Sequence, residues 1–448
     1  MRHVRAYFKV ASTLIVLTCL AFAIQPGTAA SGPAPARQDA SAQSYFPLAV
    51  FGKAVFLHGL NFSPYMDGQN PDWGSVVSEA QLRSRMVVTA PHTGWMRTFG
   101  MDHGLERSGR VAHEMGLKAA LGAWIGSSHS SNQAQIAALI KAARAGEADM
   151  VIVGSEALYR GDVSETRLLE YIAQVQAGVP EDVPVAVADV FDVLLAHPAV
   201  MAAADVVAIN MYPYWNGIPV EDGPAVLDDW YARVQAAAGD KPVIVSETGW
   251  PSCGDTRLLA VPSPENAGSY FRNVTAWARA RKIDLFYFEA FDESWKALKE
   301  GPQGACWGVW DKTGGLKPWM AAPLGGQSAA DTWSGDPALK LLHVPALNSF
   351  DDLQGYVLHA DPATHRILVY IRVGGGWWIK PTAAEPQTTI RANSLWTVDI
   401  TTGGADQTAT EIAVYLVPAT FDPPLLVGAA DLPAGLAAYP QVHATRSP

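Results

Sequence analysis

Several strand-like apolar runs in this sequence end in carboxylates. Glu156 closes "VIVGSE" and Glu247 lies in "PVIVSETGW", whereas Glu289, Asp292 and Glu293 lie in "FYFEAFDE". Two such carboxyls facing each other across a site can serve as proton donor and nucleophile in the cleavage of a glycosidic bond. Acids at the rim of a fold also bind metals or improve solubility, so position alone leaves both interpretations open.

These carboxylates need a scaffold that brings the ends of several strands together. Short apolar runs alternate with amphipathic, helix-like stretches, and the runs are "AVFLHGLNFS", "WMRTFG", "KAALGAWIG", "MVIVGSE", "VPVAVADVF", "DVVAINMYPY", "PVIVSETGW" and "DLFYFEAFDE". Continuous apolar strands indicate a parallel sheet covered by helices on both faces. Eight such strand–helix units favour a closed α/β structure, a (β/α)8 TIM barrel, over an open doubly wound sheet. No Gly-rich nucleotide loop follows the first run, which also argues against a dinucleotide-binding fold. The chemistry of such a barrel lies at the carboxyl ends of its strands, where the glutamates are.

One helix between these strands has a complete start signal. In "SPENAGSYFRNVTAWARARK", Ser263 is a predicted N-cap and Pro264 takes the first helical position. The apolar stripe that would face the barrel consists of Ala267, Tyr270, Phe271, Val274 and Trp277.

The chain divides by composition into five parts. Residues 1–30 combine a basic start, an apolar run and small residues, which predicts a cleaved secretory signal, with an uncleaved anchor as the alternative. Residues 31–45 are a predicted disordered leader, and 46–322 hold the barrel. After a linker at 323–334, residues 335–448 are rich in β-branched and aromatic runs and predict a small all-β domain, a sandwich or a barrel-like fold.

The net charge and the cysteines limit the binding partners and the cellular compartment that we expect for this protein. The formal net charge is −11 and the mature part has no basic run, which argues against nucleic-acid binding. Removal of the signal leaves Cys253 and Cys306 in a secreted or periplasmic, oxidising compartment. Because the two cysteines fall on loops after neighbouring strands, we expect a disulfide, with two unrelated buried thiols as the alternative.

The barrel region resembles glycoside hydrolase family 17, the β-1,3-glucanases and glucanosyltransferases. The resemblance spans about Leu60 to Trp310 and rests on ordered motifs, of which "VSETGWPS" is the strongest; the others are "NFSPYMDGQNP", "MRTFG", "VGSEAL", "NMYPY", "FYFEAFDESWK" and "WGVWD". It implies a retaining enzyme on β-glucan oligo- or polysaccharide, here a secreted bacterial member with an extra C-terminal β domain.

The resemblance also implies roles for individual residues. Glu156 matches the acid/base and Glu247 the nucleophile. The implied substrate-binding residues around them are Ser155, Arg97, Tyr65, Tyr212, Tyr214, Trp250, Glu293 and Lys296. Trp295 and Trp307 are further candidates for sugar platforms, although packing in the barrel wall explains a Trp equally well. No HExxH motif or Cys/His cluster occurs, so we expect no metal and no cofactor.

One residue departs from the family pattern. The position before the acid/base is normally an asparagine whose amide binds the sugar 2-hydroxyl, and here it is Ser155. In one interpretation Ser155 reaches that hydroxyl through a water and the substrate is β-1,3-glucan. In the other, the space left by asparagine accommodates a sugar on the 2-oxygen, as in β-1,2-glucan.

A non-catalytic role is the remaining alternative. The chain would then be a glucan-binding envelope protein built on a barrel scaffold. The pair Trp377 and Trp378 in the C-terminal domain is a candidate sugar-stacking surface, but successive strand residues face opposite sides, so one of the two is expected in the core. We expect a monomer without stable membrane insertion.

Overall fold

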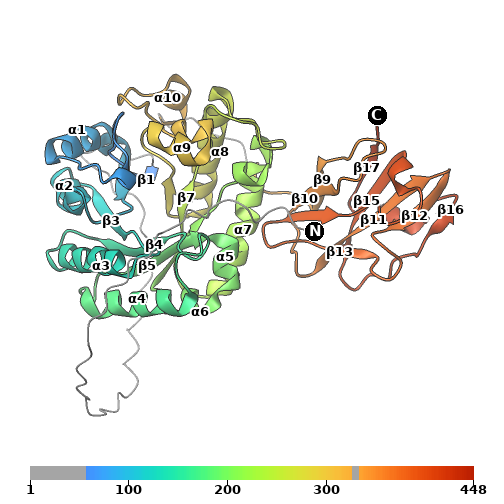
Figure 1. Ribbon diagram of the computed structural model, residues 1–448, viewed down its shortest axis with the longest axis horizontal. Helices are drawn as coiled ribbons and strands as arrows, with labels where there is room; N and C mark the ends of the chain where they lie inside the picture. The colour runs from blue at the N-terminus through green and yellow to red at the C-terminus, as the bar shows by residue number, and fades with distance from the viewer. Residues whose placement is uncertain (1–56, 325–331, 448) are drawn as a thin grey trace, which may run out of the picture. The chain divides into compact units, whose positions relative to one another are not determined.

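The computed structural model describes residues 57–324 and 332–447. The predicted signal, the leader and most of the predicted linker lie outside these residues. The first described segment is a closed parallel barrel with helices around it, which confirms the predicted fold class (Figure 1). Its strands follow one another in chain order: β1 (Leu57–Asn61), β2 (Thr93–Arg97), β3 (Lys118–Ala123), β4 (Met150–Ser155), β5 (Val185–Val190), β6 (Val206–Asn210), β7 (Val243–Thr248) and β8 (Leu285–Tyr287).

The α-helices of the barrel segment lie between and after these strands. They are α1 (Glu79–Thr89), α2 (Ser108–Glu114), α3 (His129–Arg144), α4 (Glu165–Gly178), α5 (Phe191–Ala196), α6 (Pro198–Ala203), α7 (Gly223–Ala238), α8 (Pro264–Arg281), α9 (Ala297–Glu300) and α10 (Pro318–Leu324). Helix α8 begins as predicted, with the Ser263 hydroxyl accepting from the Asn266 backbone N–H and Pro264 in the first turn. Helix α10 ends inside the segment predicted as linker.

Short 3₁₀ turns shape the loops between these elements. They are η1 (Pro71–Trp73), η2 (Ala90–His92), η3 (Leu105–Arg107), η4 (Tyr214–Asn216), η5 (Val220–Asp222), η6 (Ser294–Lys296) and η7 (Pro302–Ala305). Among the described helices none is both long and apolar enough to cross a bilayer.

The barrel interior changes from apolar to polar toward the carboxyl ends of the strands. A lower layer packs Trp95 and Phe286 against small alanines of β5 and β6. Gly59 is required there, because a Cβ at this position would lie 2.4 Å from the Phe286 ring. Above this layer the strands end in polar side chains, and β1 and β2 pair Asn61 with Arg97. The fold therefore places its polar groups at the end of the barrel where catalysis takes place in such folds.

The C-terminal segment is all-β, as predicted. One sheet has the order β14-β10-β9, and the other β16-β12-β11-β15-β17 with β13 beside β11. The elements are β9 (Ala338–His343), β10 (Leu353–Leu358), β11 (His365–Val373), β12 (Gly376–Lys380), β13 (Gln387–Thr389), β14 (Leu395–Val398), η8 (Asp406–Thr408), β15 (Glu411–Pro418), β16 (Val427–Ala429), η9 (Ala434–Ala438) and β17 (Gln441–Thr445). On β12, Trp377 is buried at 6% exposure whereas Trp378 is 37% exposed, so one member of the pair belongs to the core as expected.

Candidate active site

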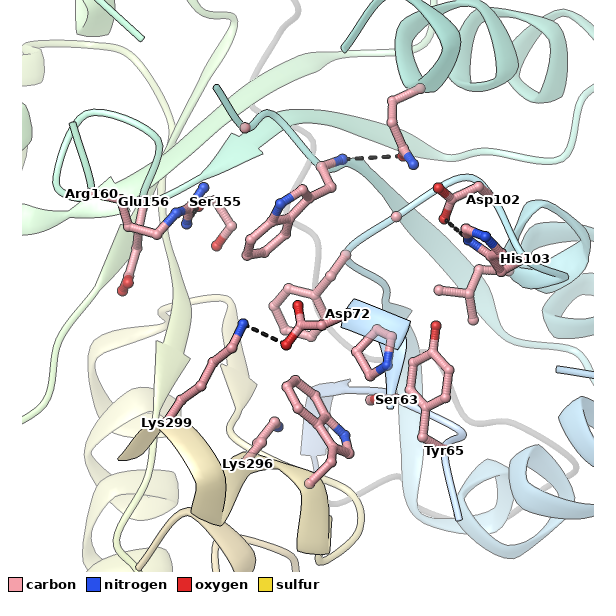
Figure 2. A pocket seen from close by; sticks show the side chains of 18 of the residues that line it. Ser63, Tyr65, Asp72, Asp102, His103, Ser155, Glu156, Arg160, Lys296 and Lys299 are labelled. Atoms are coloured by element: carbon pink, nitrogen blue, oxygen red, sulfur yellow. Dashed lines mark hydrogen bonds and ion pairs between the residues drawn. The ribbon is translucent and has the colours of Figure 1, made fainter. Parts of the chain in front are cut away.

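The carboxyl ends of the barrel strands surround a cavity of about 450 Å³ (Figure 2). Its walls come from β4, β7 and the segments after β1, β2, β3, β4 and β8; of the described lining residues, none follows β5 or β6. The cavity brings together six of the predicted site residues: Tyr65, Ser155, Glu156, Glu247, Glu293 and Lys296. These six residues come from distant parts of the chain and meet in one cavity.

Both carboxylate oxygens of Glu247 are held by hydrogen bonds. Arg97 Nη1 donates to Oε1 at 2.7 Å, and Ser155 Oγ donates to the same oxygen at 3.0 Å. The Tyr212 hydroxyl donates to Oε2 at 2.9 Å. Burial and the charge of Glu247 raise the pKa of Tyr212 well above its usual value, so this phenol stays a donor. Three donors from the ends of β2, β4 and β6 therefore hold the carboxylate in one orientation.

Arg97 connects the ends of several strands. Its side chain is only 1% exposed, and besides Glu247 it donates through Nη2 to Ser155 Oγ at 3.1 Å and through Nη1 to Asn61 Oδ1 at 2.5 Å. The Asn61 amide in turn donates to the carbonyls of Ser246 and Phe286. Burying a guanidinium is costly unless its donors find acceptors; Nη1 and Nη2 of Arg97 find them here, and these acceptors fix the geometry of the site.

Glu156 has a backbone and an environment unlike those of Glu247. Its φ of 57° lies in the left-handed region, which residues with a side chain rarely adopt and which recurs at functional sites. Its Oε1 accepts from Asn210 Nδ2 at 2.9 Å, and Asn210 Oδ1 is fixed by the Ser246 hydroxyl at 2.7 Å. Burial and then the charge of Glu247 raise the pKa of Glu156 to about 7, against which the Asn210 hydrogen bond acts. One carboxyl fixed beside a cation and another that keeps its proton near neutral pH are suited to different steps of one reaction.

A second ionic cluster lies next to β8. Lys296 pairs with Glu289 and, at 2.8 Å, with Glu293. Burial raises the pKa of Glu289 well above its usual range. Burial acts in the same direction on Glu293, but Lys296 and the hydrogen bonds from Ser63 and Trp295 outweigh it and hold the pKa of Glu293 low. Glu293 and Lys296 therefore present a rigid polar wall to the cavity, whereas Glu289 does not line it.

The structure corrects the predicted aromatic residues. Trp250 is 0% and Trp307 1% exposed, and neither lines the described cavity. Trp250 packs between Tyr214 and Tyr270 in the barrel wall, so the expectation that it contacts substrate is wrong. Tyr65 and Trp295 do line the cavity and meet edge to face at 6.4 Å.

The structure also separates the two tyrosines of "NMYPY". Tyr212 reaches Glu247, as described above, whereas the Tyr214 hydroxyl donates to the Asp255 carbonyl at 2.6 Å. Tyr214 is fully buried and does not line the described cavity. Its role is to hold the segment after β7, which corrects its assignment as a substrate-binding residue.

Three residues that sequence analysis missed belong to the site. Asn210 binds Glu156, and its position at the end of a predicted strand was an available signal. Trp124 is 44% exposed, lines the cavity directly after β3 and has the Arg160 guanidinium 4.3 Å from its ring centre. Glu300 also lines the cavity and accepts from Trp307 Nε1 at 2.9 Å, and burial raises its pKa. Glu300 follows no strand directly, so no pattern in the sequence pointed to it.

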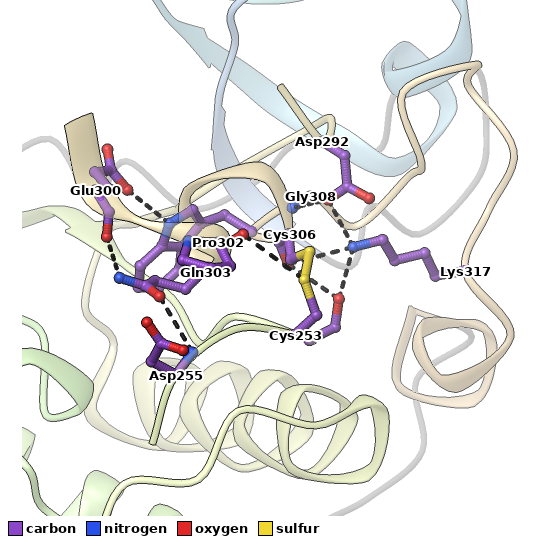
Figure 3. The surroundings of a disulfide bond; sticks show 11 residues. Cys253, Asp255, Asp292, Glu300, Pro302, Gln303, Cys306, Gly308 and Lys317 are labelled. Carbon is purple, nitrogen blue, oxygen red and sulfur yellow. Dashed lines mark hydrogen bonds and ion pairs between the residues drawn. A yellow bond between two sulfur atoms is a disulfide. The ribbon is translucent and has the colours of Figure 1, made fainter. Parts of the chain in front are cut away.

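The predicted disulfide is confirmed. Cys253 and Cys306 are bonded, with their Cα atoms 5.6 Å apart (Figure 3). The Ser252 N–H donates to the Cys306 carbonyl at 3.0 Å, and the Asp255 N–H donates to Gln303 Oε1 at 3.2 Å. The bridge thus ties the segment after β7 to the segment after β8, which carries Glu300.

No cluster of three or more His, Cys, Asp or Glu side chains arranged to hold a metal ion occurs among the described residues. The polar groups of the cavity have protein partners instead: the carboxylates bind amide, guanidinium, ammonium and hydroxyl donors. The chemistry available to these side chains is proton transfer and nucleophilic attack by a carboxylate.

Comparison with known proteins identifies the family of the barrel segment. The profile of the BtgE/BtgC glycoside hydrolase domain matches residues 59–308. A probable glucan endo-1,3-beta-glucosidase btgC of Aspergillus fumigatus is 30% identical to this chain. The aligned part is 56% of this chain and 41% of the length of that relative. A glucan 1,3-beta-glucosidase of Arthroderma benhamiae is 30% identical, with 57% of this chain and 87% of that protein covered. The crystal structure of the glycoside hydrolase family 17 beta-1,3-glucanosyltransferase of Rhizomucor miehei superimposes on this chain with a TM-score of 0.54 and 31% sequence identity. The superposition covers 59% of this chain and 97% of the Rhizomucor miehei chain. The chain belongs to the BtgE/BtgC glycoside hydrolase domain family.

Proposed function

We propose that the chain is a retaining glycoside hydrolase or transglycosylase acting on β-1,3-glucan. The observation that carries this proposal is the contrast between the two carboxyls of one cavity. Glu247 is fixed by Arg97, Ser155 and Tyr212, whereas Glu156 has its pKa raised to about 7. The relatives named for β-1,3-glucan substrates support the linkage, and an active-site mutant of the Rhizomucor miehei enzyme is known in complex with laminaritriose.

In the proposed reaction, a Glu247 oxygen attacks the anomeric carbon while the bond to the leaving oxygen breaks. Glu156 gives its proton to that oxygen, and a covalent glycosyl-enzyme forms. Glu156, now ionised, takes a proton from water or from a sugar hydroxyl, whose oxygen attacks the same carbon and releases Glu247. Water as the acceptor gives hydrolysis, and a sugar acceptor gives transfer.

The hydrogen bonds of Ser155 favour the β-1,3 linkage over the β-1,2 alternative. A serine hydroxyl has one hydrogen and two lone pairs. The hydrogen goes to Glu247 and one lone pair receives Arg97, so one lone pair remains for substrate. A free 2-hydroxyl can donate to that lone pair, as in a 3-linked glucan. A 2-oxygen inside a glycosidic bond has no hydrogen to give.

The test is incubation of the purified protein with linkage-defined glucooligosaccharides, followed by product analysis. We expect cleavage of the β-1,3 series, and products longer than the substrate where transfer competes with water. Glu247→Gln and Glu156→Gln should each lower kcat/KM by at least about 10³-fold. Binding of β-1,3-glucan without turnover would instead favour the glucan-binding envelope protein, and cleavage restricted to the β-1,2 series would refute the linkage.

The proposal includes export from the cytoplasm. It is supported by the basic and apolar pattern of residues 1–30 and by the disulfide between Cys253 and Cys306, which persists in an oxidising compartment. Mass spectrometry of the protein purified from the periplasm or the medium of the native host should find a new N-terminus near Ala30. An intact Met1 there would refute cleavage.

A further inference from the structure

The wall of the cavity includes an ion pair that has no part in the proposed reaction. Lys299 Nζ and Asp72 Oδ2 are 2.6 Å apart, and both residues line the cavity. Asp72 belongs to η1 after β1, and Lys299 to α9 after β8. Figure 2 shows the pair between the end of the cavity with Ser155 and Glu156 and the end with Tyr65 and Asp102.

The sequence holds Asp72 in place. Asn70 caps η1 by accepting the Asp72 N–H on its side chain at 2.8 Å, and Pro71 occupies the first position of the turn. Gly74 ends the turn with a φ of 70°, a conformation that glycine adopts without penalty. The backbone at Asp72 is thus fixed at the wall of the cavity, within reach of Lys299.

The cavity lies on one side of the two catalytic carboxyls. Glu156 points toward β6, where Asn210 binds it, so a leaving group protonated by Glu156 lies toward β5 and β6. Ser155, Glu156, Arg160 and Glu247 line one end of the enclosed space, and the rest of its wall comes from the segments after β1, β2, β3 and β8. The enclosed space therefore receives the sugars on the glycone side of the cleaved bond. The volume of about 450 Å³ lies in the range of ordinary ligand pockets.

We propose that the Asp72–Lys299 ion pair bounds the glycone side of the cleft and thereby sets the length of the product released from it. The inference rests on the proposed glycosidase function but not on the glucan linkage. A chain that continues past the pair must displace it or leave the cavity. Because the two side chains are 43% and 55% exposed, the pair is weak enough for a longer chain to displace it at a modest cost in affinity.

A second ion pair between the same two parts of the fold supplies a matched control. Lys312 Nζ lies 2.6 Å from Asp67 Oδ2, and both side chains are 53% exposed. Asp67 precedes η1 and Lys312 follows β8, as Lys299 does, but neither Asp67 nor Lys312 lines the cavity. Loss of this pair loosens the same segments without changing the boundary of the cavity.

The experiment compares product lengths from β-1,3- and β-1,2-linked oligosaccharide ladders for wild type, Lys299→Ala, Lys312→Ala and the charge-swapped double variant Asp72→Lys with Lys299→Asp. We expect Lys299→Ala to lengthen the main glycone product by at least one glucosyl unit. It should also raise kcat/KM up to about fivefold for oligosaccharides long enough to reach past the pair. Lys312→Ala should retain the wild-type product pattern, and the charge swap should restore it.

Three outcomes would overturn the inference, and they differ in what they say about the enzyme. If all variants cleave a ladder and give the wild-type product lengths, the ion pair bounds nothing, although the glycosidase function stands. If Lys312→Ala changes the product lengths as much as Lys299→Ala does, loosening of the two segments explains both changes. The ion pair then bounds nothing, although the glycosidase function stands. Failure to cleave either ladder would refute the proposed function and this inference together.

Discussion

The hydrogen bond from Asn210 to Glu156 controls the pH range in which Glu156 can act as the acid. The amide donates to Oε1 at 2.9 Å and favours the ionised carboxylate, so it lowers a pKa that burial and Glu247 raise to about 7. A hydrogen bond to a charged group contributes about 1.5–3 kcal/mol, and one pKa unit corresponds to about 1.4 kcal/mol. Asn210→Ala should therefore raise the pKa of Glu156 by about one to two units.

The sign of the effect on activity follows from the role of the acid. Glu156 must be protonated for the first step, so kcat/KM falls as pH rises through its pKa. This fall in kcat/KM is the alkaline limb of the pH profile. Asn210→Ala should shift the alkaline limb to higher pH, whether or not the maximal rate also declines. Ser246→Ala, which removes only the contact that orients the Asn210 amide, should move it in the same direction by less.

The assay is kcat/KM against pH on a β-1,3-glucooligosaccharide, with a dinitrophenyl β-glucoside as the control. Dinitrophenolate leaves without protonation, so the control substrate should lack the alkaline limb if the limb belongs to Glu156. An alkaline limb in Asn210→Ala that stays in place or moves to lower pH would refute the reasoning. The limb would then report a different group, or the amide would not favour the ionised form.

Further predictions concern stability. Because the pKa of Glu156 rises from 4.5 to about 7 on folding, the folded state holds this proton more tightly, and the contribution of Glu156 to stability falls as pH rises between these values. Glu156→Gln should therefore stabilise the protein by about 3 kcal/mol at pH 8 and change its stability little at pH 4, measured by denaturant unfolding. Equal effects at the two pH values would contradict this sign. Replacing Cys253 and Cys306 by serine should cost about 4 kcal/mol, since the bridge closes a loop with a sequence separation of 53, and an unchanged unfolding midpoint in non-reducing buffer would contradict it. In the C-terminal domain, Trp377→Ala should cost about 3 kcal/mol or more and the half-exposed Trp378→Ala less than about 1, which unfolding of the two variants compares directly.

The sequence by itself determined the fold class and the positions of the main carboxylates. Continuous apolar runs, each followed by an amphipathic stretch, are local signals with a fixed period, and they predicted the barrel before any contact was known. The same runs end at Glu156 and Glu247, so their place at the catalytic end of the barrel followed from topology. The cysteine pair was predicted in the same way, from loops after neighbouring strands.

Only the tertiary structure decided which neighbours each side chain has. Trp250 and Trp307 look like cleft residues in the sequence but are buried in the barrel wall, and Tyr212 rather than Tyr214 reaches Glu247. The direction of a side chain after a strand depends on the conformation of irregular loops, which no hydrophobic period encodes. Ser155 shows the same limit. Its residue type suggested a gap at the 2-oxygen, whereas its bonds to Glu247 and Arg97, from residues far apart in the chain, define what it can still offer a sugar.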